Sequence, residues 1–285
     1  MEWTSLLLEP LSYEFMQRGL IAALLVGTVC AMLSCYMVLK GWSLMGDAIS
    51  HAVLPGIVLA FISGLPFALG AFAAGMLCAV STGYIKENSR VKEDTVMGIV
   101  FSGLFATGLV LLTKIETDLH LMHILFGNML GVSWNDVAEI SIISLLTMIC
   151  IALKCRDLML YCFDPLFARL SGLPVRKLHF GLLILLSMTI VASIKAVGVI
   201  LVTAMLIAPG AIGFLLAKTF GRMMAIAFAV SVFSSISGTL ISFHADMASG
   251  PCIVVFQTVL FILAALFASS RNKLPAMIDP TSQEG

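Results

Sequence analysis

The stretch Ser43-Leu-Met-Gly-Asp-Ala-Ile-Ser-His-Ala-Val-Leu-Pro-Gly56 sets two ionisable residues, Asp47 and His51, in an almost entirely apolar run. An ionisable side chain is costly at the centre of a bilayer, so its presence there indicates a function. On a helix, residues four apart share one face and lie about 6 Å apart along the axis. A carboxylate and an imidazole directed at one point can bind a divalent transition metal. The stretch therefore predicts metal handling inside a membrane, and the alternative is a charge-stabilised packing pair beside a simple kink.

Pro55 and Gly56 follow the pair directly. Proline removes a backbone donor and strains the preceding turn, so we expect the helix to break here. Broken helices near the middle of the membrane are where transporters build ion sites, because the freed carbonyls line a cavity.

The composition places the whole chain in a membrane. Hydrophobic residues make up 60% of the 285 residues and charged residues only 11%. Apolar runs long enough to span a bilayer predict an all-α polytopic protein with nine transmembrane helices, or eight if one run is re-entrant. The loops are short, which indicates one transmembrane domain over residues 1–285, and no cleavable signal peptide is expected. The predicted spans cover 14–39, 46–64, 66–85, 95–113, 137–154, 178–195, 197–217, 222–243 and 251–269.

The basic residues predict the orientation. With the N-terminus outside, 13 of the 16 Lys and Arg residues fall in the inner loops. This positive-inside bias predicts a periplasmic N-terminus and a cytoplasmic C-terminus. If the chain is helical from Lys40 onward, Asp47 and His51 lie about 10–16 Å from the cytoplasmic face.

An inner loop, residues 162–177, combines capping residues with apolar side chains. Asp164 is suited to cap a short helix with Pro165 in its first turn, and Gly172 is placed to end it. The helix would carry Leu166 and Phe167, so it either lies on the membrane surface or docks into a partner's groove. The spacing of Asp164, Ala168 and Gly172 favours docking.

Residues at the outer side form a second, weaker candidate. His120, His123, His244 and Asp246 could relay cations at the outer mouth, although solvated loop residues are the simpler interpretation. No Gly-x-x-x-x-Gly-Lys-Ser/Thr occurs, so the chain has no P-loop with which to hydrolyse ATP. No His-Glu-x-x-His occurs, which argues against a zincin-type protease. We therefore expect a transport subunit and not an enzyme.

Five motifs, in this order, resemble those of the metal-ion permease subunits of bacterial ABC importers, which move manganese, iron or zinc. The resemblance runs from about residue 14 to 270 and is greatest to the chelated-iron/manganese permeases of enteric bacteria. The motifs are Ser43–Ala52, Asp94-Thr-Val-Met-Gly-Ile-Val-Phe101, Leu125-Phe-Gly-Asn-Met-Leu130, the Asp164/Ala168/Gly172 loop and Gly198-Val-Ile-Leu-Val-Thr-Ala-Met-Leu-Ile-Ala-Pro-Gly210.

The resemblance implies a location in the bacterial inner membrane and a set of partners. Two permease subunits, identical or different, would form the pore, with two cytoplasmic ATPase subunits, a periplasmic metal-binding protein and membrane lipid around them, and no nucleic acid. The loop containing Asp164, Ala168 and Gly172 would couple the pore to the ATPase. Asp47 and His51 match the family's metal position, so the transported Mn, Fe or Zn is a substrate and no cofactor is bound permanently.

Two other functions stay open on the residues. Asp/His pairs four apart also occur in secondary cation transporters, which would need no apolar coupling loop. An intramembrane metalloenzyme would need a general base near the metal, and the later spans supply no further buried carboxylate. Neither the metal nor the choice between a homodimeric and a heterodimeric pore follows from the sequence, because nitrogen and oxygen ligands admit Mn, Fe and Zn alike.

Overall fold

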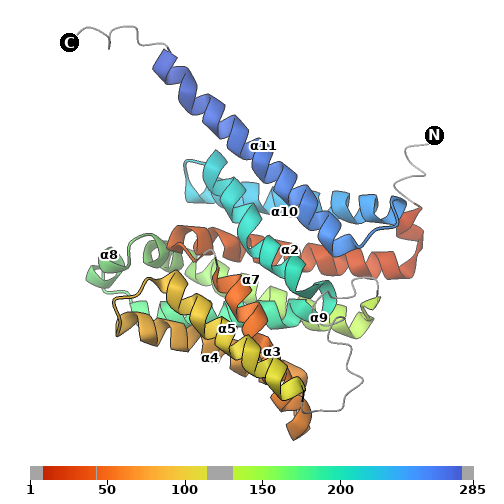
Figure 1. Ribbon diagram of the computed structural model, residues 1–285. Helices are drawn as coiled ribbons and strands as arrows, with labels where there is room; N and C mark the ends of the chain where they lie inside the picture. Colours follow the sequence, from red (N-terminus) through yellow and green to blue (C-terminus); the bar gives the residue numbers. More distant parts are fainter. Residues whose placement is uncertain (1–8, 43, 114–130, 278–285) are drawn as a thin grey trace.

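The computed structural model describes residues 9–42, 44–113 and 131–277, and within them every regular element is a helix (Figure 1). Nine helical segments in this part of the chain are long and apolar enough to span a membrane, which confirms the predicted all-α fold and its spans. His120, His123 and the Leu125–Leu130 motif lie outside the described residues. The elements are η1 (Pro10–Ser12), α2 (Glu14–Lys40), α3 (Met45–Ser63), α4 (Phe67–Glu87), α5 (Glu93–Leu112), α7 (Trp134–Phe163), α8 (Pro165–Leu170), α9 (Val175–Leu216), α10 (Phe220–His244) and α11 (Ser249–Met277).

Helix α9 supplies two of the spans, because it is interrupted at Gly198. The backbone of Gly198 has φ 80° and ψ 165°, a conformation that only glycine adopts readily. Figure 1 shows the second half of α9 turning back from the first at this point. The predicted spans 178–195 and 197–217 are therefore two oppositely directed helices joined by a single glycine.

The predicted break at Pro55-Gly56 is wrong, since α3 runs without interruption from Met45 to Ser63. Helix α4 packs directly against this segment, and a Cβ atom on Gly56 would overlap with the backbone of Gly70. Helix α5 is equally close, because a Cβ on Gly108 would lie 2.9 Å from the nitrogen of Pro55. Pro55 cannot donate to the His51 carbonyl, yet the segment stays helical where α4 and α5 pack closely against it.

The chain turns after Lys40, which also corrects the assumption of a continuous helix from that residue. Gly41 ends α2 in a left-handed conformation with φ 74°. Trp42 then folds into the core with 1% of its surface exposed, and α3 begins at Met45. Asp47 thus lies in the first turn of α3, so the depth of 10–16 Å counted along a helix from Lys40 does not apply.

Helix α7 is longer than the predicted 137–154. A capping box between Ser133 and Asp136 starts it, and it continues to Phe163. Lys154, where the apolar run ends, has non-helical dihedral angles, and its ammonium pairs with Asp157 at 3.1 Å. Helix α7 therefore bends at Lys154 without ending there.

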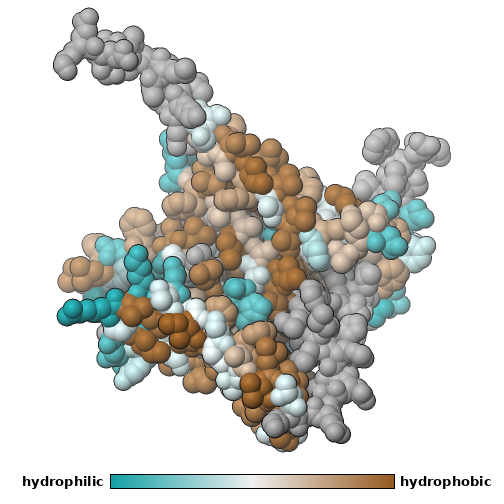
Figure 2. Space-filling view, viewed as in Figure 1, coloured by the Kyte–Doolittle hydropathy of each residue, from teal (hydrophilic) through white to brown (hydrophobic). Residues whose placement is uncertain are grey.

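Helices α2 and α9 lie at the centre of the bundle. Helix α2 packs against α9, α10 and α7, and α3 packs against α4, α5 and α9 (Figure 1). Large apolar side chains such as Leu153, Val110 and Phe267 remain exposed on the outside. Figure 2 shows these apolar surfaces extending over the helices, as expected of a protein surrounded by lipid.

Candidate functional site

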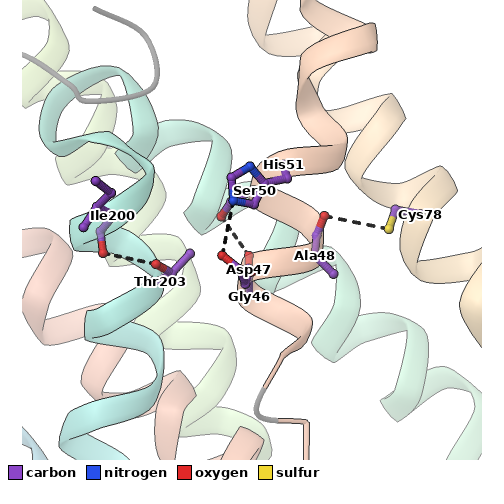
Figure 3. Close-up of polar contacts among 8 residues, drawn as sticks. All are labelled: Gly46, Asp47, Ala48, Ser50, His51, Cys78, Ile200 and Thr203. Atoms are coloured by element: carbon purple, nitrogen blue, oxygen red, sulfur yellow. Dashed lines mark hydrogen bonds and ion pairs between the residues drawn. The ribbon is translucent and has the colours of Figure 1, made fainter. Parts of the chain in front are cut away.

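Asp47 and His51 point toward one another from adjacent turns of α3, as the spacing predicts (Figure 3). Their Oδ1 and Nε2 atoms are 3.4 Å apart, longer than the usual hydrogen bond of about 2.9 Å. Two ligand atoms about 2.1 Å from one metal ion are separated by about 3.0–3.4 Å in octahedral or tetrahedral geometry. The observed separation is therefore suited to shared coordination of a metal ion.

Two phenylalanines of α5 hold the His51 ring. Phe105 meets the imidazole edge-on with centroids 5.4 Å apart, and Phe101 stacks on it at 6.2 Å. Nδ1 of His51 is buried without a hydrogen-bond partner, whereas Nε2 faces Asp47. Because only Nε2 is directed at a ligand position, it is the nitrogen that would bind a metal.

The interruption of α9 lies beside the pair. A narrow pocket at His51 is lined by Ile194 and Val199, which flank Gly198 on either side, and by Phe105. The sequence thus misplaced the irregular backbone: it belongs to α9, a neighbour of the site, and not to α3.

The described residues supply only part of a metal-coordination shell at this pair. Within the described residues, no group of three or more His, Cys, Asp and Glu side chains comes together. The Ser50 hydroxyl donates a hydrogen bond to the Gly46 carbonyl at 2.7 Å, and the Thr203 hydroxyl donates one to the Ile200 carbonyl at 3.1 Å (Figure 3). Both hydroxyls are thus engaged with the backbone of their own helix. The side chains of Asp47 and His51 remain 40% and 31% exposed, so further ligands can approach from outside the chain.

The 162–177 loop forms the expected short helix, α8. Asp164 Oδ1 accepts hydrogen bonds from the backbone N–H groups of Leu166 and Phe167, both at 2.9 Å. At the other end, Gly172 has φ 79°, and the N–H of Leu173 donates to the Ala168 carbonyl at 3.1 Å. These bonds form a Schellman motif, so both ends are capped as the sequence predicts.

The surface of α8 is divided between a buried anchor and exposed apolar side chains. Ala168 is completely buried, whereas Leu166, Phe167 and Leu170 are 66%, 56% and 79% exposed. Exposed apolar side chains of this size on a loop helix are typical of an interaction surface.

Of the residues predicted at the outer mouth, the structure describes His244 and Asp246, and it shows no polar contact between their side chains. His244 is exposed, and its Nδ1 lies 2.9 Å from the Leu240 carbonyl. Asp246 follows in the turn with φ 51°, and no hydrogen bond or ion pair joins it to His244. Their role at the outer mouth stays a prediction.

Four further residues lie around His51 that were not predicted as site residues: Phe101, Phe105, Ile194 and Val199. The i, i+4 spacing of Phe101 and Phe105 indicates that they share a face of α5, but not that this face meets His51.

Comparison with known proteins gives matches over almost the whole chain. The model of the ABC 3 transport family matches residues 12–268. The chain is 62% identical over 263 residues to the chelated iron transport system membrane protein YfeD of Yersinia pestis, covering 92% of this chain and 89% of that protein. It is 50% identical over 262 residues to the manganese transport system membrane protein MntB of Synechocystis, covering 92% and 86%. Among solved structures, PsaBC from Streptococcus pneumoniae in complex with Fab matches with a TM-score of 0.80 and 38% identity, covering 88% of this chain and 91% of that chain.

Proposed function

We propose that this chain, which belongs to the ABC 3 transport family, is the membrane-spanning permease subunit of an importer of iron or manganese. ATP hydrolysis on a separate subunit drives the transport, since this sequence has no P-loop. The observation that carries the proposal is the Asp47–His51 pair, which has a spacing suited to a shared metal ion and is partly exposed on α3.

A second permease subunit completes the metal-binding site. Among the residues that the structure describes, the pair offers one carboxylate and one imidazole, fewer ligands than a divalent transition metal takes. A second, equivalent pair across an interface would give two carboxylates and two imidazoles. The partner is a second copy of this chain or a related permease.

Helix α8 is the docking element for the ATPase. Its exposed Leu166, Phe167 and Leu170 fit an apolar groove, while the caps at Asp164 and Gly172 keep the short helix formed before it docks. With α8 docked on the ATPase, we expect α8 and the C-terminus on the cytoplasmic side of the inner membrane, and a metal-binding protein that delivers the ion at the opposite, periplasmic face.

The pair recognises the ion without holding it tightly, because conduction requires release. Gly198 gives α9 a hinge beside His51, where a change in the angle between its two halves would open or close the pocket. Relatives named for iron and for manganese favour these metals, whereas zinc is the competing substrate that the ligand types also admit.

The test is ATP-dependent uptake of radiolabelled Fe, Mn and Zn into proteoliposomes that contain the assembled complex. Asp47→Ala and His51→Ala are compared with wild type after equal assembly has been confirmed. Asp157→Ala is the matched control, since Asp157 also pairs with a basic residue on its own helix but lies far along the chain on α7.

Uptake of iron or manganese that is lost in both site variants and kept in Asp157→Ala supports the proposal. Uptake unchanged by the site variants would reduce the pair to a packing role. Metal uptake that needs no ATP would replace the importer with the secondary transporter.

A further inference from the structure

Four side chains at the α8 end of the bundle form a cluster that the metal site does not include. We call Lys40, Trp42, Tyr161 and His179 the loop-base cluster. The Tyr161 hydroxyl lies 2.8 Å from His179 Nδ1, and Lys40 Nζ sits 4.4 Å from the centre of the Tyr161 ring. The Trp42 indole meets the His179 ring edge-on, with centroids 5.4 Å apart. Tyr161 and Trp42 are 2% and 1% exposed, so the four pack as a unit.

The cluster closes the base of the coupling loop. Tyr161 lies in the last turn of α7, just before α8, and His179 lies in the second turn of α9, just after it. Their hydrogen bond joins residues 18 apart and ties the two ends of the loop to each other. A displacement of α8 would therefore move the end of α7 and the start of α9 together.

The other half of the cluster leads to the metal ligands. Lys40 is the last residue of α2, and Trp42 lies in the turn before α3. The N–H of Met45, where α3 begins, donates to the Trp42 carbonyl at 3.3 Å. Asp47 follows two residues later, so the position of the Trp42 indole helps to fix where the ligand-bearing turn starts.

We propose that the loop-base cluster transmits the displacement of the coupling loop to the Asp47–His51 pair, with Tyr161 and His179 as positioning residues. The inference rests on the proposed function and names the contact through which the ATPase acts on the site. The Tyr161–His179 hydrogen bond is its central element, because it directly links the last turn of α7 to the second turn of α9 across the loop.

The first experiment measures metal uptake and ATP hydrolysis in the same proteoliposomes and takes their ratio. Tyr161→Phe removes the hydroxyl but keeps the ring beneath Lys40, and His179→Phe removes the other partner. Each is expected to lower the metal imported per ATP hydrolysed about three- to tenfold, the range that one hydrogen bond supports. Combining the two should cause no further fall, since both remove the same bond.

Tyr36→Phe is the matched control. The Tyr36 hydroxyl also links α2 to α7, at 3.3 Å from Cys155 Sγ, but it does not lie at the base of the coupling loop. Its removal should leave the ratio unchanged.

A second readout does not require transport. In a complex in which Trp3 and Trp134 are replaced by phenylalanine, Trp42 is the permease's only tryptophan. Site-selective labelling of tryptophan with a fluorinated analogue would report on its contact with His179. Addition of ATP is expected to shift the Trp42 signal, and Tyr161→Phe is expected to abolish the shift.

An unchanged transport ratio and an unchanged Trp42 response in Tyr161→Phe would overturn the proposal. An equal fall in Tyr36→Phe would also overturn it, because the loss would then be a general loosening of α7. A transport ratio that falls in the double variant by the product of the single effects would overturn it too, because the two residues would then act independently and not through one hydrogen bond. If the wild-type complex imports no metal with ATP, the proposed function is contradicted instead. The Trp42 response to ATP in Tyr161→Phe then still tests whether the loop-base cluster transmits the displacement of the loop.

Discussion

The carbonyl oxygens of Gly56 on α3 and Gly70 on α4 each occupy the place that a Cβ atom on the other residue would take. The two backbones are therefore in direct contact beside Pro55, little more than one turn from His51. The contact lies where proline would favour a break, yet α3 continues as one helix from the Asp47–His51 pair past Pro55 to Ser63.

Gly70→Ala should destabilise the permease. The added methyl group has no space between the two backbones, and overpacking costs about 1–3 kcal/mol. Thermal unfolding of the purified protein in detergent is expected to move to lower temperature. Gly103→Ala on α5 is the control, because its Cβ would meet no atom within 4 Å. Equal melting shifts in both variants would contradict the close contact.

Phe105→Ala should weaken metal uptake by releasing the His51 ring. An edge-to-face aromatic contact is worth about 0.5–1.5 kcal/mol, so the KM for the metal should rise about two- to tenfold while kcat changes less. Uptake measured over a range of metal concentrations gives both constants. Phe233→Ala removes a similar contact with Phe256, 5.5 Å away on another helix pair, and should leave KM unchanged. An unchanged KM in Phe105→Ala would show that the ring is held by other contacts.

Asp164→Ala should weaken binding of the ATPase. It leaves two backbone N–H groups of α8 without their acceptor, and loss of such a cap costs about 1 kcal/mol. The affinity of the purified ATPase for the permease is the measurement, and Asp164→Asn, which keeps an acceptor oxygen, should restore most of it. Ser133→Ala removes the cap of α7 and should have no effect. The prediction fails if Asn and Ala behave alike at position 164.

Leu170→Ser should reduce ATPase binding without lowering the stability of the permease. The side chain is 79% exposed, so it contributes little to the fold but presents apolar area to a partner. Binding and thermal unfolding are measured on the same preparation. Met247→Ser changes an exposed apolar side chain in the turn between α10 and α11 and should affect neither quantity. A stability loss in Leu170→Ser would instead assign the residue to internal packing.

The two ends of α8 show how much local sequence can predict. The acceptor at Asp164, the proline at 165 and the glycine at 172 act on the nearest backbone groups, so their effects can be inferred without knowing the fold. The spans were predictable for a similar reason, since a bilayer requires long apolar helices whatever their arrangement.

The behaviour of Pro55 and Gly198 depends on what packs against them. Proline disrupts a helix by its own chemistry, yet α4 and α5 approach closely enough to keep α3 intact. Glycine permits a turn without requiring one, and the sequence predicts a boundary between two spans beside Lys195 without showing that the chain turns at Gly198. The positions of these features relative to His51 could not be predicted from spacing.

The sequence by itself determined that the chain crosses a membrane many times, that Asp47 and His51 share one helical face, and that a short capped helix with apolar side chains lies between α7 and α9. These follow from composition and from interactions within a few residues. Only the tertiary structure decided that phenylalanines of α5 contact the His51 ring, that the pair remains partly exposed, and that Tyr161 of α7 meets His179 of α9 beside Trp42. Such relationships depend on which helix faces meet, and each is set by packing among residues far apart in the chain.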